Sequence, residues 1–263
     1  MKIEAALPAL VTGASSGIGR SIALGLGKRG CRVAIVARSA APLEELAAEI
    51  GDAGGSALPL VADVSDEEQI ATAVVRTVEA FGQLRLVVAN AGHGRYGSVK
   101  DQPAEHVEST IGVNYVGMTR TVRHALPHLL KAAPAHVVGV TSSAGLIPHR
   151  SASAYCASKA ASNAYLATLR LEVFDHGVGV SWVCPGLVRT PFVGKAELDP
   201  DRDLPRLARW LVRDLEADEV AEAVLRAVER NRSEVVMPGM MRFFAWTRRV
   251  TPRLADWLNR RVG

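Results

Sequence analysis

The octapeptide TGASSGIG, residues 12–19, follows a short apolar run and opens a segment with helical periodicity. The run ALVT (9–12) predicts a strand, and Ile18 and Ile22 begin a helical repeat. The loop carries glycines at positions 13, 17 and 19. Glycines let the backbone turn tightly, and the free N–H groups of a helix start attract negative charge. This context is typical of a dinucleotide-binding loop, although a glycine-rich turn without a ligand can show the same pattern.

The remaining chain repeats this alternation of strand and helix. Strands are expected at 32–37, 57–63, 84–90, 136–142, 179–184 and 233–237, and helices near 42–50, 65–78, 104–131, 153–175 and 218–230. Parallel strands joined through helices form right-handed crossovers. We therefore predict one domain over residues 1–263, of the α/β class: a doubly wound parallel sheet of about seven strands with helices on both faces.

Local signals refine this prediction. Pro59 is awkward inside a ladder and suggests that the third strand lies at an edge of the sheet. The sequence SDEE (65–68) fits a capping box that opens the next helix. Two segments fall outside the alternation: 191–216, predicted to form a lid, and a basic and aromatic tail at 239–263. The lid is expected to contain a helix with Leu204, Leu207, Leu211 and Leu215 on one side.

Composition excludes several classes of protein. A net charge of +4 over 263 residues does not indicate a general nucleic-acid surface. Cys31, Cys156 and Cys184 are too few and too scattered for a disulfide framework or a metal cluster, so we interpret them as core residues. No metal is implied. The apolar run before the glycine loop reads as a first strand and not as a signal peptide, and no apolar run reaches about 18 residues. We expect a cytoplasmic protein.

The end of the second predicted strand distinguishes between the two nicotinamide dinucleotides. NAD-preferring folds commonly place an acidic residue there, which binds the ribose hydroxyls. Here Ala37 is followed by Arg38, whose guanidinium can pair with a 2′-phosphate. The sequence therefore favours NADP(H), with NAD(H) less favoured, unless Arg38 is simply solvated.

The stretch AYCASK (154–159) places Tyr155 and Lys159 four positions apart on one face of a helix. Two such groups can be an exposed surface pair. They can also be a phenol whose pKa is lowered by the neighbouring ammonium group, which would make its proton mobile at neutral pH. The other motifs favour the second interpretation.

Together, these motifs resemble the short-chain dehydrogenase/reductases, in their single-domain subgroup, from about residue 8 to about residue 240. The first motif matches as Thr12-Gly13-x-x-x-Gly17-x-Gly19, and PGLVRT (185–190) matches the loop after the sixth strand. In ANAG (89–92), Ala89 stands where the family usually has asparagine. The resemblance implies a Rossmann-type fold and a nicotinamide cofactor.

The resemblance also implies a catalytic set. Tyr155 and Lys159 fit the family's Tyr-x-x-x-Lys motif, and Ser142 lies thirteen positions before the tyrosine, with Ser143 as its competitor. Asn114, in the helix after the fourth strand, fits the fourth member. Tyr155 would exchange a proton with the substrate oxygen, Ser142 would hold that oxygen, Lys159 would tune the phenol and bind the nicotinamide ribose, and Asn114 would help to hold a water.

The cofactor contacts implied by the resemblance extend over five loops. They are Gly13, Ser15, Ser16, Gly17, Ile18, Gly19, Arg38, Asp63, Val64, Asn90, Gly92, Tyr155, Lys159, Pro185, Gly186, Val188 and Thr190.

The implied activity is NADPH-dependent reduction of a ketone or aldehyde. The alternatives are an alcohol dehydrogenase that works toward oxidation and a non-catalytic NADP(H)-sensing regulator. Substrate choice is expected in 93–97, 146–152 and 191–216, whose residues suggest a mainly apolar carbonyl compound. His93 and His149 lie in these loops and can contact the substrate, although solvated loop histidines are the more common case.

Two expectations concern assembly. The resemblance implies a homodimer or homotetramer through the helices near 104–131 and 153–175. The tail residues Trp246, Val250, Leu254, Trp257 and Leu258 fall near helical spacing among arginines. We interpret the tail as a helix over the cleft or on a neighbouring subunit, or else as a basic amphipathic segment on an anionic membrane surface.

Overall fold

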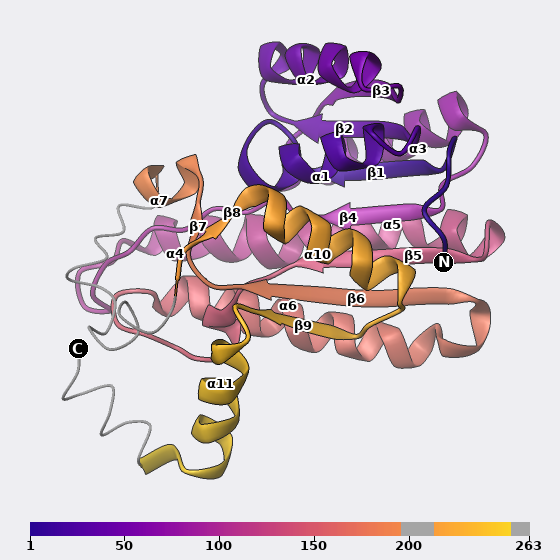
Figure 1. Ribbon diagram of the computed structural model, residues 1–263. Helices are drawn as coiled ribbons and strands as arrows, with labels where there is room; N and C mark the ends of the chain where they lie inside the picture. Colours follow the sequence, from indigo (N-terminus) through magenta and orange to yellow (C-terminus); the bar gives the residue numbers. More distant parts are fainter. Residues whose placement is uncertain (196–212, 254–263) are drawn as a thin grey trace.

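The computed structural model describes residues 1–195 and 213–253, and a seven-stranded sheet forms its centre (Figure 1). The strands are β1 (Pro8–Thr12), β2 (Arg32–Ala37), β3 (Ser56–Val61), β4 (Leu86–Ala89), β5 (Ala135–Val140), β6 (Val178–Pro185) and β9 (Glu234–Met237). Their order is β3-β2-β1-β4-β5-β6-β9, and every neighbouring pair is parallel. The chain reverses its direction of winding between β1 and β4. The predicted doubly wound parallel sheet is confirmed.

Helices cover both faces of this sheet (Figure 1). The helices on one face are α1 (Gly17–Gly27), α2 (Ala40–Asp52) and α10 (Ala217–Glu229), and those on the other are α3 (Glu67–Phe81), α5 (Met118–Lys131) and α6 (Ser153–Glu172). Successive strand residues point to opposite faces. In β1, Val11 therefore joins the core that contains Ile22 of α1, and Leu10 joins the core that contains Val122 of α5.

The third strand and the helix after it show one confirmed prediction and one wrong one. Pro59 lies in β3, which is the edge strand, as predicted. The capping box expected at Ser65 is wrong by one residue, because Asp66 is the N-cap of α3 and its carboxylate accepts from Gln69 N at 3.0 Å. Ser65 instead donates its hydroxyl to Asp63 Oδ1 at 2.7 Å. That bond withdraws the serine side chain from the helix start.

The predicted helix over 104–131 is present but is not uniform. It consists of α4 (Ala104–Ile111), a π-helical turn at Gly112–Gly117 and α5, without a break between them. Wide turns of this kind are rare and tend to occur at functional sites. This one contains Asn114.

The two segments outside the alternation are described in part. Strand β7 (Val188–Arg189) pairs with β8 (Leu215–Glu216), and α7 (Pro191–Lys195) follows β7. Leu215, predicted on a helix, is instead fully buried in β8. The positions predicted at Leu204, Leu207 and Leu211 lie outside the described residues, as do residues 254–263 of the tail. The described tail forms α11 (Met240–Val250). None of the described helices has the length and apolar character needed to cross a membrane.

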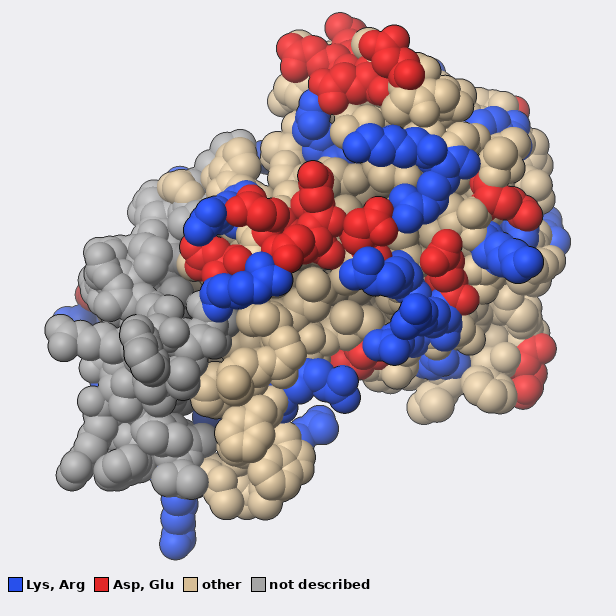
Figure 2. All heavy atoms as spheres, in the orientation of Figure 1, with Lys and Arg blue, Asp and Glu red and all other residues tan. Residues whose placement is uncertain are grey.

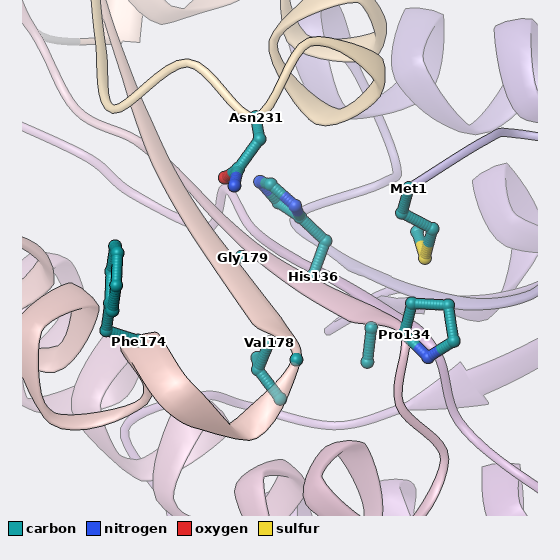
Figure 3. Close-up of a pocket in the computed structure, with 9 residues that line it drawn as sticks. Met1, Pro134, His136, Phe174, Val178, Gly179 and Asn231 are labelled. Atoms are coloured by element: carbon teal, nitrogen blue, oxygen red, sulfur yellow. The ribbon is translucent and has the colours of Figure 1, made fainter.

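A cavity of ≈ 150 Å³ lies at the amino-terminal end of β5 and β6, around His136 (Figure 3). His136 Nε2 lies 2.8 Å from Ser181 Oγ, and that hydroxyl donates to Arg232 O. Because the serine proton goes to the carbonyl, Nε2 must carry the imidazole proton. Burial lowers the pKa of His136 to about 3, so the ring is neutral. We interpret this histidine as a structural link between two strands and the turn before β9.

Close packing around Gly145 holds α6 against the loop after β5. A Cβ at this position would lie 2.7 Å from Lys159 C, 2.9 Å from Ala160 N and 2.8 Å from Asn163 Nδ2. Backbone atoms cannot move aside without shifting the helix that carries Tyr155. The absence of a side chain at Gly145 therefore allows α6 to pack closely against the loop after β5.

We expect Gly145→Ala to lower the free energy of unfolding by about 1–3 kcal/mol, because the new methyl group overpacks the contact with α6. Gly51→Ala in α2 is the matched control, since a Cβ there meets nothing within 4 Å. The control should keep or raise stability by about 0.5–1 kcal/mol. Urea denaturation measures both, and an equal effect of the two substitutions would contradict the packing argument.

Candidate active site

The candidate site lies at the carboxyl edge of the sheet, where β1 and β4 end side by side. Thr12 Oγ1 accepts from the backbone N–H groups of Asn90, at 3.1 Å, and Ala91, at 3.2 Å. In return, the Asn90 side-chain amide donates to Thr12 O at 3.0 Å and to Gly13 O at 3.2 Å. These bonds fix the loop after β1 relative to the loop after β4.

The glycine loop makes contacts that a side chain would block. A Cβ on Gly19 would lie 2.2 Å from Gly13 O and 2.4 Å from Asn90 Nδ2. Gly13 and Gly17 have φ of +66° and +53°, a region that favours glycine, and a Cβ on Gly17 would meet the Thr190 side chain at 3.0 Å. Since α1 begins at Gly17, the loop presents a helix N-terminus to this narrow space. A dinucleotide pyrophosphate fits these residues.

The outer residues of the loop remain accessible. Ser16 is exposed at the N-cap of α1, and its side chain makes no capping bond. Ser15 and Ile18 are half-buried. Ser15, Ser16 and Ile18 are therefore available on the side from which a cofactor would approach.

Arg38 and Asp63 lie beyond the glycine loop, at the ends of β2 and β3. Arg38 Nη1 lies 3.9 Å from Asp63 Oδ2, and the arginine side chain is 77% exposed. The other Asp63 oxygen accepts from Ser65 N at 2.8 Å. Val64 is buried against Gly117, where a Cβ would approach Val64 Cγ2 to 2.7 Å. Arg38 and Asp63, both predicted cofactor contacts, thus form a loose ion pair with an exposed guanidinium group.

The predicted catalytic residues converge at the start of α6. Tyr155 and Lys159 are 8% and 5% exposed, and Lys159 Nζ lies 5.8 Å from the centre of the Tyr155 ring. Lys159 Nζ donates to Val140 O, at the end of β5, at 3.1 Å. Ser142, also buried, follows β5. Its Oγ accepts from Ala144 N at 3.1 Å and donates toward Pro185 O at 3.5 Å, and its side chain lies near enough to the Tyr155 phenol to lower the pKa of that group. The structure therefore brings the three side chains together.

The protonation of this group differs from the sequence expectation. Burial raises the pKa of Tyr155 to about 12, and the hydrogen bond from Ser142 opposes this only in part. Burial likewise lowers the pKa of Lys159 to about 8. The expected lowering of the tyrosine pKa by Lys159 is thus wrong for the cofactor-free site, because desolvation drives both groups toward their neutral forms.

Asn114, the fourth predicted catalytic residue, links the π-helical turn to the loop after β4. Its Nδ2 donates to His93 O at 2.8 Å and to Ser158 Oγ at 3.0 Å, and its Oδ1 accepts from His93 N at 2.8 Å. A Cβ on Gly92 would lie 3.1 Å from Asn114 Oδ1 and 3.4 Å from Lys159 Nζ. Gly92, Asn114 and Lys159 therefore meet at one point.

The loop after β6 completes the site. Gly186 N donates to Met237 O of β9 at 2.7 Å, Val188 is buried, and Thr190 Oγ1 approaches Val188 O at 3.5 Å. Pro185 ends β6 opposite Met237. The loop 185–190 thus reaches the glycine loop through Thr190.

Aromatic side chains cover the phenol of Tyr155. The rings of Tyr96 and Phe192 lie with their centres 6.3 and 5.7 Å from its ring, and His149 stacks on Tyr96 at 5.6 Å. A Cβ on Gly94 would lie 2.9 Å from Tyr155 Cδ2. Residues from all three segments predicted to select substrate therefore lie around the phenol, whereas residues 196–212 of the predicted lid lie outside the described residues.

Sequence reasoning missed two supporting hydroxyl groups. Ser158 accepts from Asn114 and donates to Tyr155 O at 2.8 Å, and the Thr12 hydroxyl joins β1 to β4. The position of Ser158 one turn after Tyr155 was the available signal, since a serine there can bond back to the preceding turn.

The sequence of this chain is similar to those of known oxidoreductases. A family model described as short chain dehydrogenase matches residues 8–201. The probable oxidoreductase EphD of Mycobacterium tuberculosis is 35% identical over 232 residues, which cover 84% of this chain. The matched region spans only 39% of that relative's length.

Two solved structures have the same fold. A short chain dehydrogenase from Burkholderia cenocepacia in complex with NADP has a TM-score of 0.80 and 30% identity, over 89% of this chain and 97% of that one. A short chain dehydrogenase/reductase from Burkholderia phymatum in complex with NAD has a TM-score of 0.85 and 26% identity, over 97% and 96%. The neighbours therefore include complexes with either dinucleotide.

The buried Lys159 generates a stability prediction for the cofactor-free protein. Its pKa is about 8 in the folded state against 10.5 for an unperturbed lysine, so the unfolded chain binds more protons between these values. Relative to Lys159→Met, wild-type protein should therefore gain stability as pH rises from 7 to about 10, by roughly 2–4 kcal/mol. The exposed Lys131→Met should show no such trend. Denaturant unfolding across this pH range measures the free energy of unfolding of all three proteins. If the stability of Lys159→Met changed with pH in the same way as that of the wild type and Lys131→Met, the prediction would be wrong.

Proposed function

Since this chain belongs to the short-chain dehydrogenase/reductase family, we propose that it is an NADPH-dependent oxidoreductase that reduces a ketone or aldehyde to an alcohol. The observation that carries the proposal is the convergence of Ser142, Tyr155 and Lys159 beside Gly92 at the carboxyl edge of the sheet. Ligands of doubly wound folds bind at this edge, where the strand order reverses.

The residues present fit a nicotinamide dinucleotide. The glycine loop and the start of α1 would hold the pyrophosphate, Asp63 and Val64 would flank the adenine, and the nicotinamide would lie near Gly92 and Thr190. When bound, this group supplies the hydride that a carbonyl carbon accepts, or takes it back from an alcohol. The chain's own residues then bind, orient and exchange the proton.

Tyr155 is the proton donor in this proposal. Hydride addition to a bare carbonyl would create an unstabilised alkoxide, so an acid must face the oxygen. With a pKa of about 12, the buried phenol carries its proton at neutral pH, as reduction requires. In the oxidative direction the same oxygen would accept the proton, and the ratio of reduced to oxidised cofactor determines which direction prevails.

Ser142 and Lys159 prepare the phenol for this exchange. Ser142 lies beside the Tyr155 phenol and would hold the substrate oxygen against it. Lys159 has a pKa of about 8, so its protonation changes near neutral pH. It can therefore help to restore the proton that the Tyr155 hydroxyl has donated. Asn114 keeps the loop after β4 in place through both of its amide atoms.

The preference for NADP(H) rests on Arg38. Its guanidinium lies at the end of β2, is 77% exposed and, within residues 1–195 and 213–253, forms a 3.9 Å ion pair with Asp63. A 2′-phosphate can accept charge-assisted hydrogen bonds from this group, which a 2′-hydroxyl cannot match. The substrate is proposed to be mainly apolar, because Tyr96 and Phe192 form the cover over Tyr155.

Assembly as a homodimer or homotetramer is part of the same proposal. Exposed apolar residues on the predicted interface helices support it, with Val107 of α4 38% and Leu171 of α6 78% exposed. Their burial between subunits would remove apolar area from water.

Tyr155→Phe should lower turnover of NADPH with carbonyl substrates by about 10²–10⁴-fold, because the proton donor is lost. Cofactor affinity should stay unchanged, as measured by fluorescence titration. Tyr165→Phe, on the same helix, is the matched control and should retain activity. A panel of ketones, aldehydes, quinones and acyl thioesters provides the assay. Substantial turnover by Tyr155→Phe on a substrate of the wild-type enzyme would rule out this role.

Arg38→Ala should raise the KM for NADPH by about 10- to 100-fold and leave the KM for NADH nearly constant, because only the 2′-phosphate loses its partner. Arg76→Ala, an exposed arginine on α3, should change neither constant. Steady-state kinetics measure the KM for NADPH and for NADH of the wild type and both variants. Equal losses with NADPH and NADH would assign Arg38 a structural role instead.

A further inference from the structure

Helix α11 projects from the edge of the sheet (Figure 1). Large apolar side chains on one of its sides are exposed. It follows β9, and none of its residues is buried. Met240, Phe243, Trp246 and Val250 are 45%, 55%, 58% and 57% exposed. Their spacing of three and four residues places them on one side of the helix. We call these four residues the α11 face.

The α11 face is an ordered surface and not a set of isolated residues. The rings of Phe243 and Trp246 lie 6.2 Å apart, and Phe243 also contacts Phe244 at 6.1 Å. Over α11 the surface in Figure 2 is mainly uncharged in this view. Met241 packs on the main core and anchors the helix from its other side. Contiguous exposed apolar surface of this kind marks a binding site.

The charged residues of α11 and of the segment around it are all basic. Arg242 and Arg249 are exposed on α11, and Arg253 is exposed just after it. No Asp or Glu occurs between Glu234 and Asp256. An apolar face with aromatic residues and flanking arginines is the pattern of a helix that lies in the interface of an anionic membrane.

The same charges disfavour a second copy as the occupant. If two α11 faces packed on each other, the arginines of one copy would approach those of the other without carboxylates from 235–255 to pair with them. An anionic lipid surface, by contrast, complements the arginines and accepts the apolar side chains among its acyl chains.

The helix begins close to the candidate active site. Met237, at the end of β9, accepts from Gly186 N at 2.7 Å, and a Cβ on Gly186 would lie 4.0 Å from Ser143 Oγ. A membrane or other surface that binds α11 would therefore lie next to the carboxyl edge of the sheet, which carries the candidate active site.

From these observations we propose that the α11 face is a peripheral docking surface for anionic phospholipid membranes. Met240, Phe243, Trp246 and Val250 enter the headgroup–acyl boundary, and Arg242 and Arg249 contact lipid phosphates. This property is separate from the reaction proposed above, and it would hold for a catalytically inactive chain.

Co-sedimentation with vesicles tests the proposal on the full chain. We expect the wild-type protein to bind phosphatidylcholine vesicles that contain phosphatidylglycerol at least about tenfold more tightly than pure phosphatidylcholine vesicles at low salt, with loss of binding as salt rises. F243S/W246S should lower binding to the anionic vesicles by about tenfold or more. R242Q/R249Q should reduce the preference for phosphatidylglycerol.

The matched control is V61S/V75S, which replaces exposed apolar residues of β3 and α3, at the opposite edge of the sheet. It should bind like wild type. Circular dichroism and Tm confirm that every variant is folded. Failure of the wild-type protein to bind anionic vesicles, or an equal loss in the control, overturns the proposal. Light scattering measures the oligomeric state of the wild type and of F243S/W246S. If the wild type is an oligomer and the variant is not, the α11 face binds a second copy of the chain, and the membrane proposal is overturned.

Discussion

The site depends on the close approach of two loops that leaves no room for a side chain. Gly13 and Gly19 lie so near to each other and to Asn90 that a Cβ on Gly19 would overlap Gly13 O. The same Asn90 amide then binds Thr12 O and Gly13 O. Because these contacts join the ends of β1 and β4, they determine where a dinucleotide can enter and where the residues of α6 lie relative to it.

Desolvation is the second controlling influence, and it acts on Tyr155 and Lys159 together. Each group is buried, and each has its pKa moved toward the neutral form. A neutral phenol is the proper state for giving a proton to a carbonyl oxygen, and an amine with a pKa near 8 exchanges protons readily. The aromatic cover of Tyr96 and Phe192 maintains this low-polarity environment.

The sheet, its seven strands and the grouping of Ser142, Tyr155 and Lys159 could be predicted from the sequence, because apolar periodicity and motif spacing are local signals. The π-helical turn around Asn114 could not, because the stretch Gly112–Gly117 lies inside one continuous helical segment and no proline marks where the wide turn begins. The shift of the α3 cap to Asp66 depended on a competing bond between Ser65 and Asp63. The raised pKa of Tyr155 required knowledge of burial, which sequence spacing does not contain.

The bond between Gly186 and Met237 has a consequence for biosynthesis. Gly13 and Asn90, which join the loops after β1 and β4, have both been synthesised once the chain reaches residue 90, whereas Gly186 gains its partner Met237 only when β9 has been synthesised. The two ends of the site are therefore completed at very different stages of translation. A chain that ended before Met237 would leave Gly186 N without the carbonyl that accepts its hydrogen bond.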